Sequence, residues 1–475
     1  MKLRPFFARL LSAAFFFAAL GAVLAPGGRA SAGEPDAPAA RREAARRPNI
    51  LLIVADDLGY NDVSCNWTQN DRAQDSRIPT PNVDRIAESG VRFVQFFAAA
   101  PACTPSRACL LTGQYPARVG MSAVLMGSGG MSGNVVTVAE TLKAAGYRTG
   151  AIGKWHLGYT GDMRPTRQGF EEFFGHLGGK IDYFKHTDTA QKGKHDLWEG
   201  EQEVQREGYS TNLFTDRAVE FVKKHSGEPF FLYLAYNAPH YAHADKDALQ
   251  APDEWIRKFA KGPKPTDREV YSAMVACMDD GIGRVLASLK EQKIDGDTLV
   301  IFMSDNGADP KYGGSNYPLS GHKRDVLEGG VRVPMAACWP GVIPAGKVSK
   351  EQVHMADFLP TALAAAGVQP PAGAKLDGAN MLEVLKGAAP ASELPRFFHY
   401  AGDTALRRGK WKLDRIKGAA KLFDLETDLQ EKQDLSARER AVRDSMIKEL
   451  DQYMVDLKLS KTKGKGKAQE DHEGE

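Results

Sequence analysis

The chain has 475 residues, of which 26% are charged and 43% hydrophobic, and its formal net charge is only +2. These values are typical of an ordinary soluble globular protein, and the length suits one large domain with a smaller companion. No overall basic charge marks the chain as a nucleic-acid binder, so any anion binding has to be local.

The first 32 residues have the pattern of a secretory signal peptide. Basic residues precede an apolar stretch at 10–24, and an A-x-A cleavage site ends at Ala32. A membrane anchor is the alternative, but the stretch is short and no second apolar segment supports it. We therefore expect export, to the periplasm or the medium, with no stable membrane span. Residues 33–47 are rich in Ala, Pro and Arg and are expected to form a linker.

Three apolar segments rich in branched or aromatic residues predict strands buried on both faces, at 49–55, 230–236 and 298–303. Each is followed by polar residues: Asp56 and Asp57, then Asn237 to His240, then Ser304 to Asn306. Ligands of open α/β sheets bind beyond the carboxyl ends of the strands. The pattern therefore locates a candidate site.

Helical patterns at 136–145, 211–224, 271–292 and 357–366 alternate with these strands. Such alternation predicts an α/β fold with a large mixed, mostly parallel sheet flanked by helices, over residues 48–385. Short strands at 407–413 and 421–425 and a helix at 438–455 predict a small α+β domain with a short antiparallel sheet, over 386–457. Residues 458–475 are charged and expected to be disordered.

The five cysteines are sparse and form no C-x-x-C pair, which argues against a disulfide framework or a zinc site. Most are expected to be unpaired core residues. Cys103 differs because Pro105 favours a helix start, which would place its thiol at the positive end of the helix dipole. Arg107 lies four residues later on the same helical face. The residues alone allow a reactive thiol or an ordinary buried cysteine.

Asp56, Asp57, Asp305 and Asn306 offer hard oxygen ligands from two strand ends, a set that suits Ca²⁺ or Mg²⁺ and not Zn²⁺. Each alone could equally be a turn or helix-cap residue. Candidate basic residues follow other segments: Lys154 and His156, which share a face if the chain is extended, then His240, and Lys323 in a glycine-containing loop.

The chain resembles the type I, formylglycine-dependent sulfatases. The resemblance rests on Cys-x-Pro-Ser-Arg followed by Leu-Thr-Gly at 103–113, and on the strand-end Asp-Asp, Gly-Lys-x-His, Pro-His, Ser-Asp-Asn-Gly and Gly-x-Lys elements in the family's order. It implies the alkaline-phosphatase-like fold. It also implies one bound Ca²⁺, with Mg²⁺ less favoured, and the ligands of this ion would be Asp56, Asp57, Asp305, Asn306 and position 103. It also implies that a formylglycine-generating enzyme converts Cys103 to Cα-formylglycine during maturation.

The resemblance assigns roles to the remaining residues. Lys154, Lys323 and His240 would hold the sulfate, Asp305 would help activate the hydrated aldehyde, and Arg107 would hold the diol. His156 would take the proton that releases sulfate, and Lys323 or His240 would protonate the leaving alcohol.

Two other functions are consistent with the sequence: a phosphonate monoester or phosphodiester hydrolase of the same superfamily, and a non-catalytic carbohydrate-binding relic. Sulfated sugars are the expected substrates. Specificity is expected in the loops 176–207 and 241–267, which carry Lys180, Lys185, His186, His195, Trp198, His243 and Trp255.

Overall fold

The computed structural model describes residues 47–67, 77–243, 248–389 and 394–459. The predicted signal peptide, the linker up to residue 46 and the tail from residue 460 lie outside this range. Within the described residues, no helix combines the length and the apolar character needed to cross a bilayer.

A ten-stranded sheet forms the centre of the fold. Its first strand, β1 (Asn49–Ala55), pairs in parallel with β10 (Phe230–Ala235) on one side and β11 (Thr298–Ser304) on the other. The remaining strands extend the sheet: β4 (Arg148–Lys154), β5 (Glu172–His176), β8 (Trp198–Glu199) and β9 (Gln202–Glu203) beyond β10, and β12 (Met335–Cys338), β2 (Val91–Phe93) and β13 (Lys347–Ser349) beyond β11. This mixed, mostly parallel order confirms the predicted fold class.

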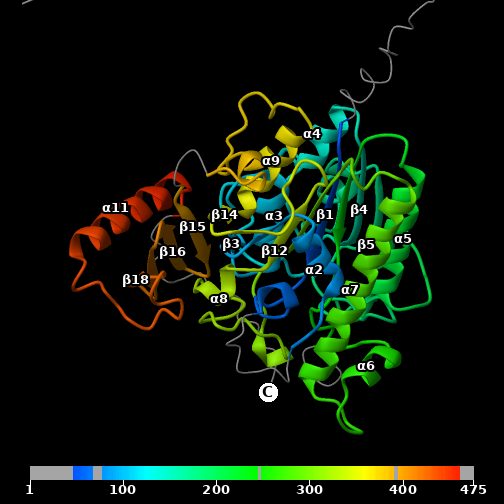
Figure 1. Ribbon diagram of the computed structural model, residues 1–475, viewed down its shortest axis with the longest axis horizontal. Coiled ribbons are helices and arrows are strands. Elements are labelled where there is room, and N and C mark those ends of the chain that lie inside the picture. Colours follow the sequence, from blue (N-terminus) through cyan, green and yellow to red (C-terminus); the bar gives the residue numbers. More distant parts are fainter. Residues whose placement is uncertain (1–46, 68–76, 244–247, 390–393, 460–475) are drawn as a thin grey trace, which may run out of the picture. The chain divides into compact units, whose positions relative to one another are not determined.

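Helices cover both faces of the sheet (Figure 1). Alternate residues of β1 point to opposite sides, so that Ile50 and Leu52 join one buried cluster and Leu51 and Ile53 the other. The first cluster includes residues of α3 (Cys103–Thr112), α4 (Val138–Ala144) and α9 (Phe358–Ala365); the second includes α2 (Pro81–Glu88), α5 (Ser210–Lys224) and α7 (Asp267–Glu291). An all-apolar strand such as β1 is stable here because neither face meets water.

Capping explains where two helices differ from the predicted bounds. In α7 the start lies four residues earlier than expected because Thr266 and Glu269 form a capping box. A second box, formed by Thr137 and Glu140, fixes the start of α4 two residues later than expected.

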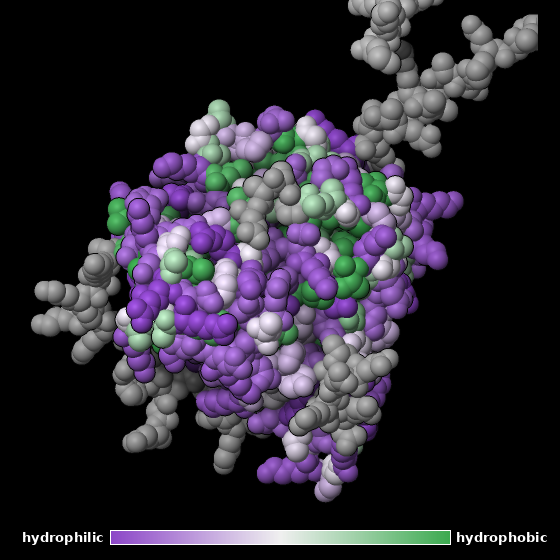
Figure 2. Space-filling model, turned by 60° about the vertical axis from the view of Figure 1, so that its left-hand side comes forward, coloured by the Kyte–Doolittle hydropathy of each residue, from purple (hydrophilic) through white to green (hydrophobic). Residues whose placement is uncertain are grey.

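The C-terminal part is a four-stranded antiparallel sheet with one helix, α11 (Arg440–Asp456). Its strands are β15 (Arg396–Tyr400), β16 (Asp403–Arg408), β17 (Trp411–Ile416) and β18 (Ala419–Asp424). The predicted single strand at 407–413 is wrong: Gly409 has φ +54°, and the chain turns there between β16 and β17. Met446 and Leu450 of α11 pack in one apolar cluster with Leu406. Figure 2 brings this side forward and shows a mostly hydrophilic surface with small, separate hydrophobic areas.

Shorter elements complete the described residues. They are β3 (Phe96–Phe97) paired with β14 (Val353–His354), β6 (Thr187–Asp188) paired with β7 (Lys194–His195), α6 (Asp253–Phe259), α8 (Glu328–Val331), α10 (Leu382–Leu385), and 3-10 turns at Ser64–Asn66, Gly161–Met163, Pro165–Arg167, Pro310–Tyr312 and Met355–Asp357. All five cysteines are free, and four of them are buried.

Candidate active site

The ends of β1 and β11 bring the predicted oxygen ligands together. Because the two strands are parallel and Ala55 lies opposite Ser304, the residues that follow them meet at one edge of the sheet. The Asp57 backbone N–H donates to Asp305 Oδ1 at 3.2 Å, and Asn306 Nδ2 donates to Asp57 Oδ1 at 2.6 Å. All four side chains, Asp56 included, are buried.

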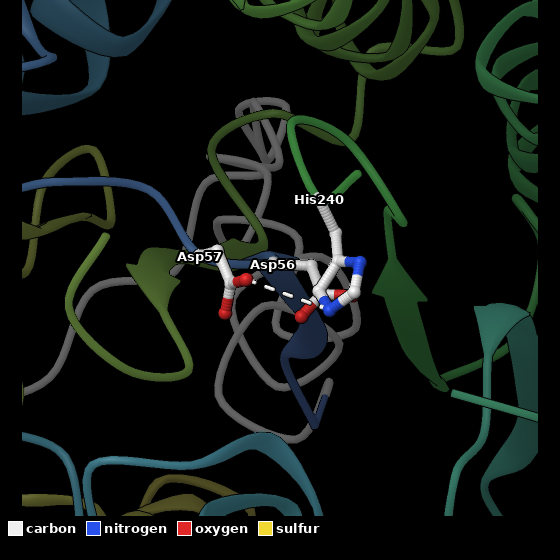
Figure 3. A group of neighbouring side chains, drawn as sticks. All are labelled: Asp56, Asp57 and His240. Carbon is white, nitrogen blue, oxygen red and sulfur yellow. Dashed lines mark ion pairs between the residues drawn. The ribbon is translucent and has the colours of Figure 1, made fainter. Parts of the chain in front are cut away.

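His240, after β10, completes this group (Figure 3). Its Nε2 lies 3.5 Å from Asp57 Oδ2, and one potential ligand atom each from Asp56, Asp57 and His240 lie within 4.8 Å of one another. The sequence had predicted a substrate contact for His240, and the structure places its ring nitrogen beside the predicted metal ligands as well.

Two ammonium groups reach the same carboxylates. Lys154 ends β4, and its Nζ lies 2.5 Å from Asp56 Oδ2. Lys323 Nζ lies 2.7 Å from Asp57 Oδ2 and 3.0 Å from His240 Nε2. Both lysines are buried, with 1% and 4% of their surface exposed. A buried lysine is rare unless it is paired, so neither is an ordinary surface residue.

Arg107 ties α3 to this edge of the sheet. Its Nε and NH2 each lie 2.8 Å from Asp305 Oδ2, and its NH1 donates to the Lys154 carbonyl and to the Tyr233 hydroxyl. Although burial works against ionisation, Arg107 and then Lys154 hold the pKa of Asp305 below its usual value. Tyr233 was missed by the sequence analysis because it is one aromatic residue within an apolar strand.

Cys103 is the first residue of α3, two residues earlier than the helix start expected at Pro105, and Ala102 is its N-cap. It is 2% exposed. Its side chain lines a pocket together with His156, His240 and Lys323. The thiol thus faces the predicted basic residues at the positive end of a helix.

The two histidines present an unprotonated nitrogen. His156 Nε2 lies 3.1 Å from the Leu125 carbonyl, which can only accept, so Nε2 carries the proton; Nδ1 is buried without a partner. In the same way His240 Nδ1 donates to the Tyr241 carbonyl at 2.7 Å, which leaves Nε2 as the acceptor. Burial, reinforced by the nearby lysines, lowers the pKa of both rings. The chain is extended at Lys154, the last residue of β4, but not at His156, which has φ +55°, so the condition under which the two side chains would share a face is not met.

The donor set fits a hard cation. Asp56 Oδ1 and Asn306 Oδ1 are buried and have no hydrogen-bond partner among the described residues, which is costly unless a cation or water binds them. Burial raises the pKa of Asp56 despite Lys154, and a bound cation would favour the ionised form. Asp56, Asp57 and Asp305 balance Lys154, Lys323 and Arg107, so a divalent ion would leave the site positive and suited to an anionic ester.

Around the pocket, Lys180 is joined by three residues that the sequence analysis did not name: Tyr241, Tyr312 and Arg324. Tyr241 stacks on His240 at 4.4 Å and on Tyr312 at 3.9 Å between ring centroids. Lys180 Nζ lies 5.1 Å from the centre of the Tyr241 ring, and Arg324 also lines the pocket. The position of Arg324 directly after Lys323 was the available signal.

Of the seven predicted specificity residues, only Lys180 lines this pocket. Three of the others have structural contacts elsewhere: His243 bonds to Asp182, His186 to the Gly208 carbonyl, and Trp198 to Asp196. Neither they nor Lys185, His195 and Trp255 are among the residues that line the pocket around Cys103.

Two family profiles and several related proteins match this chain. The sulfatase family profile matches residues 48–368, and a profile described as N-sulphoglucosamine sulphohydrolase, C-terminal, matches residues 321–459. The chain is 35% identical to N-acetylgalactosamine-6-sulfatase of Sus scrofa over 395 residues, 76% of this chain and 69% of that protein. It is 34% identical to arylsulfatase J of Mus musculus, over 71% of this chain and 56% of that protein.

Solved structures show the same fold. Ps i-CgsB in complex with k-i-k-neocarrahexaose superposes with a TM-score of 0.79 at 37% identity, over 86% of this chain and 93% of that one. The PsFucS1 sulfatase from Pseudoalteromonas sp. has a TM-score of 0.72 at 26% identity, over 88% and 92% of the two chains. The phosphonate monoester hydrolase SpPMH from Silicibacter pomeroyi, at 20% identity and a TM-score of 0.63, shares the fold alone.

The fold and the site define a hydrolase of the alkaline-phosphatase-like superfamily. Within it, the chain belongs to the sulfatase family and is a sulfuric ester hydrolase.

Proposed function

We propose that this protein is an exported sulfatase that removes sulfate from carbohydrate sulfate monoesters by means of a formylglycine made from Cys103. The observation that carries the proposal is the pocket in which Cys103 meets His156, His240 and Lys323 beside the carboxylate group. The formylglycine would be made by a separate formylglycine-generating enzyme. Its hydrated form supplies a nucleophilic hydroxyl and a second hydroxyl whose deprotonation releases sulfate.

Calcium is the metal we propose for Asp56, Asp57, Asp305 and Asn306, with position 103 as a further ligand. The support is the all-oxygen set from the two strand ends and the two buried oxygens that lack a partner. When bound, the ion would supply positive charge for the sulfate oxygens and for the nucleophile. His240 Nε2 could add a nitrogen contact, which is less typical of Ca²⁺.

Substrate binding falls to the chain's own cations. A sulfate monoester is anionic and repels a nucleophile, so positive groups have to hold it. Lys323 lines the pocket beside Asp57, whereas Lys154, beside Asp56, and Arg107, beside Asp305, are buried and are not among the residues that line it. Asp305 is kept ionised by that contact, which suits it to orient the attacking hydroxyl.

The proton steps can be assigned from the ring nitrogens. His156 is neutral with a free Nδ1, as a general base that takes the proton of the second hydroxyl requires. His240 has no proton on Nε2, whereas Lys323, 3.0 Å away, carries protons and has a raised pKa, which Asp57 maintains against burial. Of the two candidates, Lys323 is therefore the acid that protonates the leaving alcohol.

The pocket rim favours a sugar substrate. An aromatic ring such as Tyr241 can pack on the apolar face of a sugar, while Lys180 and Arg324 place positive charge near further sulfate or carboxylate groups. Relatives named for N-acetylgalactosamine-6-sulfatase activity, and a relative solved with a carrahexaose, support a sulfated carbohydrate as the substrate class. Export is proposed from the signal pattern of residues 1–32.

A substrate panel tests this proposal. Purified protein is assayed for sulfate release from sulfated mono- and oligosaccharides, with an aryl sulfate and an aryl phosphodiester in parallel. We expect the sulfated sugars and the aryl sulfate to be hydrolysed much faster than the phosphodiester. Faster hydrolysis of the phosphodiester would assign the chain to the alternative hydrolase class.

A further inference from the structure

Lys323 reaches the pocket around Cys103 from a loop, residues 320–327, which we call the Lys323 loop. The two ends of this loop lie side by side, because the Gly329 N–H, just beyond it, donates to the Ser320 carbonyl at 2.6 Å. The side chain of a lysine is long and flexible, so the backbone from which it starts decides where its ammonium can lie. The way in which the loop ends are held therefore bears on the position of the Lys323 ammonium.

Glu431, which follows the C-terminal sheet, holds both ends of the Lys323 loop through one oxygen. Its Oε2 accepts from the Ser320 hydroxyl at 2.8 Å and from the Glu328 backbone N–H, where α8 begins, at 2.9 Å. The Glu431 side chain is only 1% exposed. Hydrogen bonds to an ionised and buried acceptor are stronger than those between neutral groups. One carboxylate from the C-terminal part thus clamps the base of the loop.

Lys412 of β17 compensates the charge of this carboxylate. Its Nζ lies 2.6 Å from Glu431 Oε1 and 3.2 Å from Glu328 Oε1, and the Lys412 side chain is fully buried. Although burial works against ionisation, Lys412 leads the charges that hold the pKa of Glu328 below its usual value. An ion pair in this position connects the C-terminal sheet with α8 and, through Glu431, with the Lys323 loop.

The role assigned to Lys323 needs an accurately placed ammonium. Its Nζ lies 2.7 Å from Asp57 Oδ2 and 3.0 Å from His240 Nε2. A displacement of about 1 Å of a reacting group, even one caused by a distant change, can lower a rate by roughly two powers of ten. A shift of the loop ends by this amount would therefore be visible in turnover.

We propose that Glu431, supported by Lys412, is a positioning residue for Lys323 and keeps its ammonium where it can protonate the leaving alcohol. This inference rests on the proposed function, in which Lys323 is that acid. Glu431 is not among the residues that line the pocket, so it acts through the loop and not by contact with the substrate. The C-terminal sheet and the segment after it then contribute to catalysis as well as to stability.

The first experiment compares kcat of Glu431→Ala on two aryl sulfates that differ in the acidity of the leaving phenol. With the weakly acidic phenol, which needs protonation, kcat should fall roughly tenfold or more, and with the strongly acidic phenol by less than about threefold. Asp357→Asn is the control, because Asp357 is also buried and lies 2.7 Å from Arg396 in an ion pair outside the loop. It should lower stability but keep the wild-type ratio of the two kcat values. A wild-type ratio in Glu431→Ala would overturn the proposal.

Lys323→Ala in the same assay separates this inference from the proposed function. If Lys323→Ala itself keeps the wild-type ratio, the acid role is wrong and the positioning role falls with it. If Lys323→Ala changes the ratio and Glu431→Ala does not, only the positioning role is wrong. In the double variant, the Glu431 change should alter the ratio little further, because the group that it positions is gone. A full additional change would show that Glu431 does not act through Lys323.

Ser320→Ala covers the case in which Glu431→Ala folds poorly. It removes one of the two donors to Glu431 Oε2 and leaves every buried charge in place. We expect a change of the kcat ratio in the same direction, by about two- to fivefold, since one hydrogen bond to the clamp remains. An unchanged ratio in folded Ser320→Ala would overturn the proposal.

Discussion

Arg107 and Asp305 form a buried pair in which two guanidinium nitrogens each lie 2.8 Å from one carboxylate oxygen. The pair joins the first turns of α3, which carries Cys103, to the end of β11, which carries the predicted metal ligands. Both side chains are fully buried. Their contact therefore fixes the position of α3, which carries Cys103, relative to the predicted metal ligands.

Arg107→Met should destabilise the protein strongly, because it leaves the Asp305 carboxylate buried without its cation. Breaking a buried pair from one side costs roughly 3–5 kcal/mol. Arg408→Met is the control, since Arg408 and Glu449 are partly exposed and such pairs contribute about 0–1 kcal/mol. Chemical denaturation measures the free energy of unfolding of both variants. Similar losses would show that the Arg107–Asp305 pair contributes no more to stability than the exposed pair.

Lys323→Ala and Lys154→Ala should each lower turnover by roughly two to three powers of ten, the loss expected for a charge that stabilises the transition state in a water-poor site. Lys323→Ala should be the more damaging with a sugar sulfate, because the alcohol leaves poorly without protonation. With an activated aryl sulfate that extra loss should shrink. Steady-state kinetics on both substrates test this, and an equal loss on both would remove the acid role from Lys323.

Metal removal should abolish turnover while the fold persists. The Lys154 and Lys323 ammonium groups already lie within 2.7 Å of Asp56 and Asp57 and can balance part of their charge without an ion. We expect chelation to leave the far-UV circular dichroism unchanged and calcium, not zinc, to restore turnover. Asp56→Asn should bind calcium more weakly in metal analysis. Stoichiometric zinc in active protein would contradict the assignment.

Cys103 should be absent as a thiol in active protein. Peptide mass spectrometry should show a loss of about 18 Da at this residue, the difference between a cysteine and its aldehyde. Cys103→Ala should be inactive but folded. Cys109→Ala, six residues on in the same helix, should keep most turnover because Cys109 is a buried core residue that does not line the pocket. Active protein with an unmodified Cys103 would refute the mechanism.

Asp182 should stabilise the two predicted specificity loops in a pH-dependent way. Burial opposes its charge, but hydrogen bonds from the Lys185 N–H, Gln250 and other donors lower its pKa from 3.8 to about 2. Because the pKa is lower in the folded state, the ionised Asp182 stabilises the fold at pH values above the pKa that it has in the unfolded chain. This stabilisation is lost as the pH falls through the folded-state pKa of about 2. Asp182→Asn should therefore cost about 2 kcal/mol at pH 7, and the difference should shrink between pH 4 and pH 2. Thermal unfolding across this pH range measures the difference in stability between the wild type and Asp182→Asn. A difference that does not change with pH would refute the role of the Asp182 charge.

The local pattern of the sequence was enough for three adjacent strands of the main sheet, β11, β1 and β10. The bounds of β1 and β11 follow from uninterrupted apolar runs that end in polar residues, because a strand buried on both faces has to be apolar along its whole length. The hairpin at Gly409 was missed because its two strands are short and the turn lies inside an apparently continuous pattern.

Residue types and their spacing in the sequence determined the chemical groups of the site: a cysteine at a helix start, acids after two strands, and basic residues after others. Only the tertiary structure decided how they interact. Arg107 and Asp305 lie 198 residues apart, the protonated nitrogen of His156 is set by the Leu125 carbonyl, and Glu431 accepts from the hydroxyl of Ser320, 111 residues earlier in the chain. Such contacts depend on the packing of segments that are distant in the sequence. A local sequence pattern therefore does not predict which buried polar group forms a hydrogen bond and which does not.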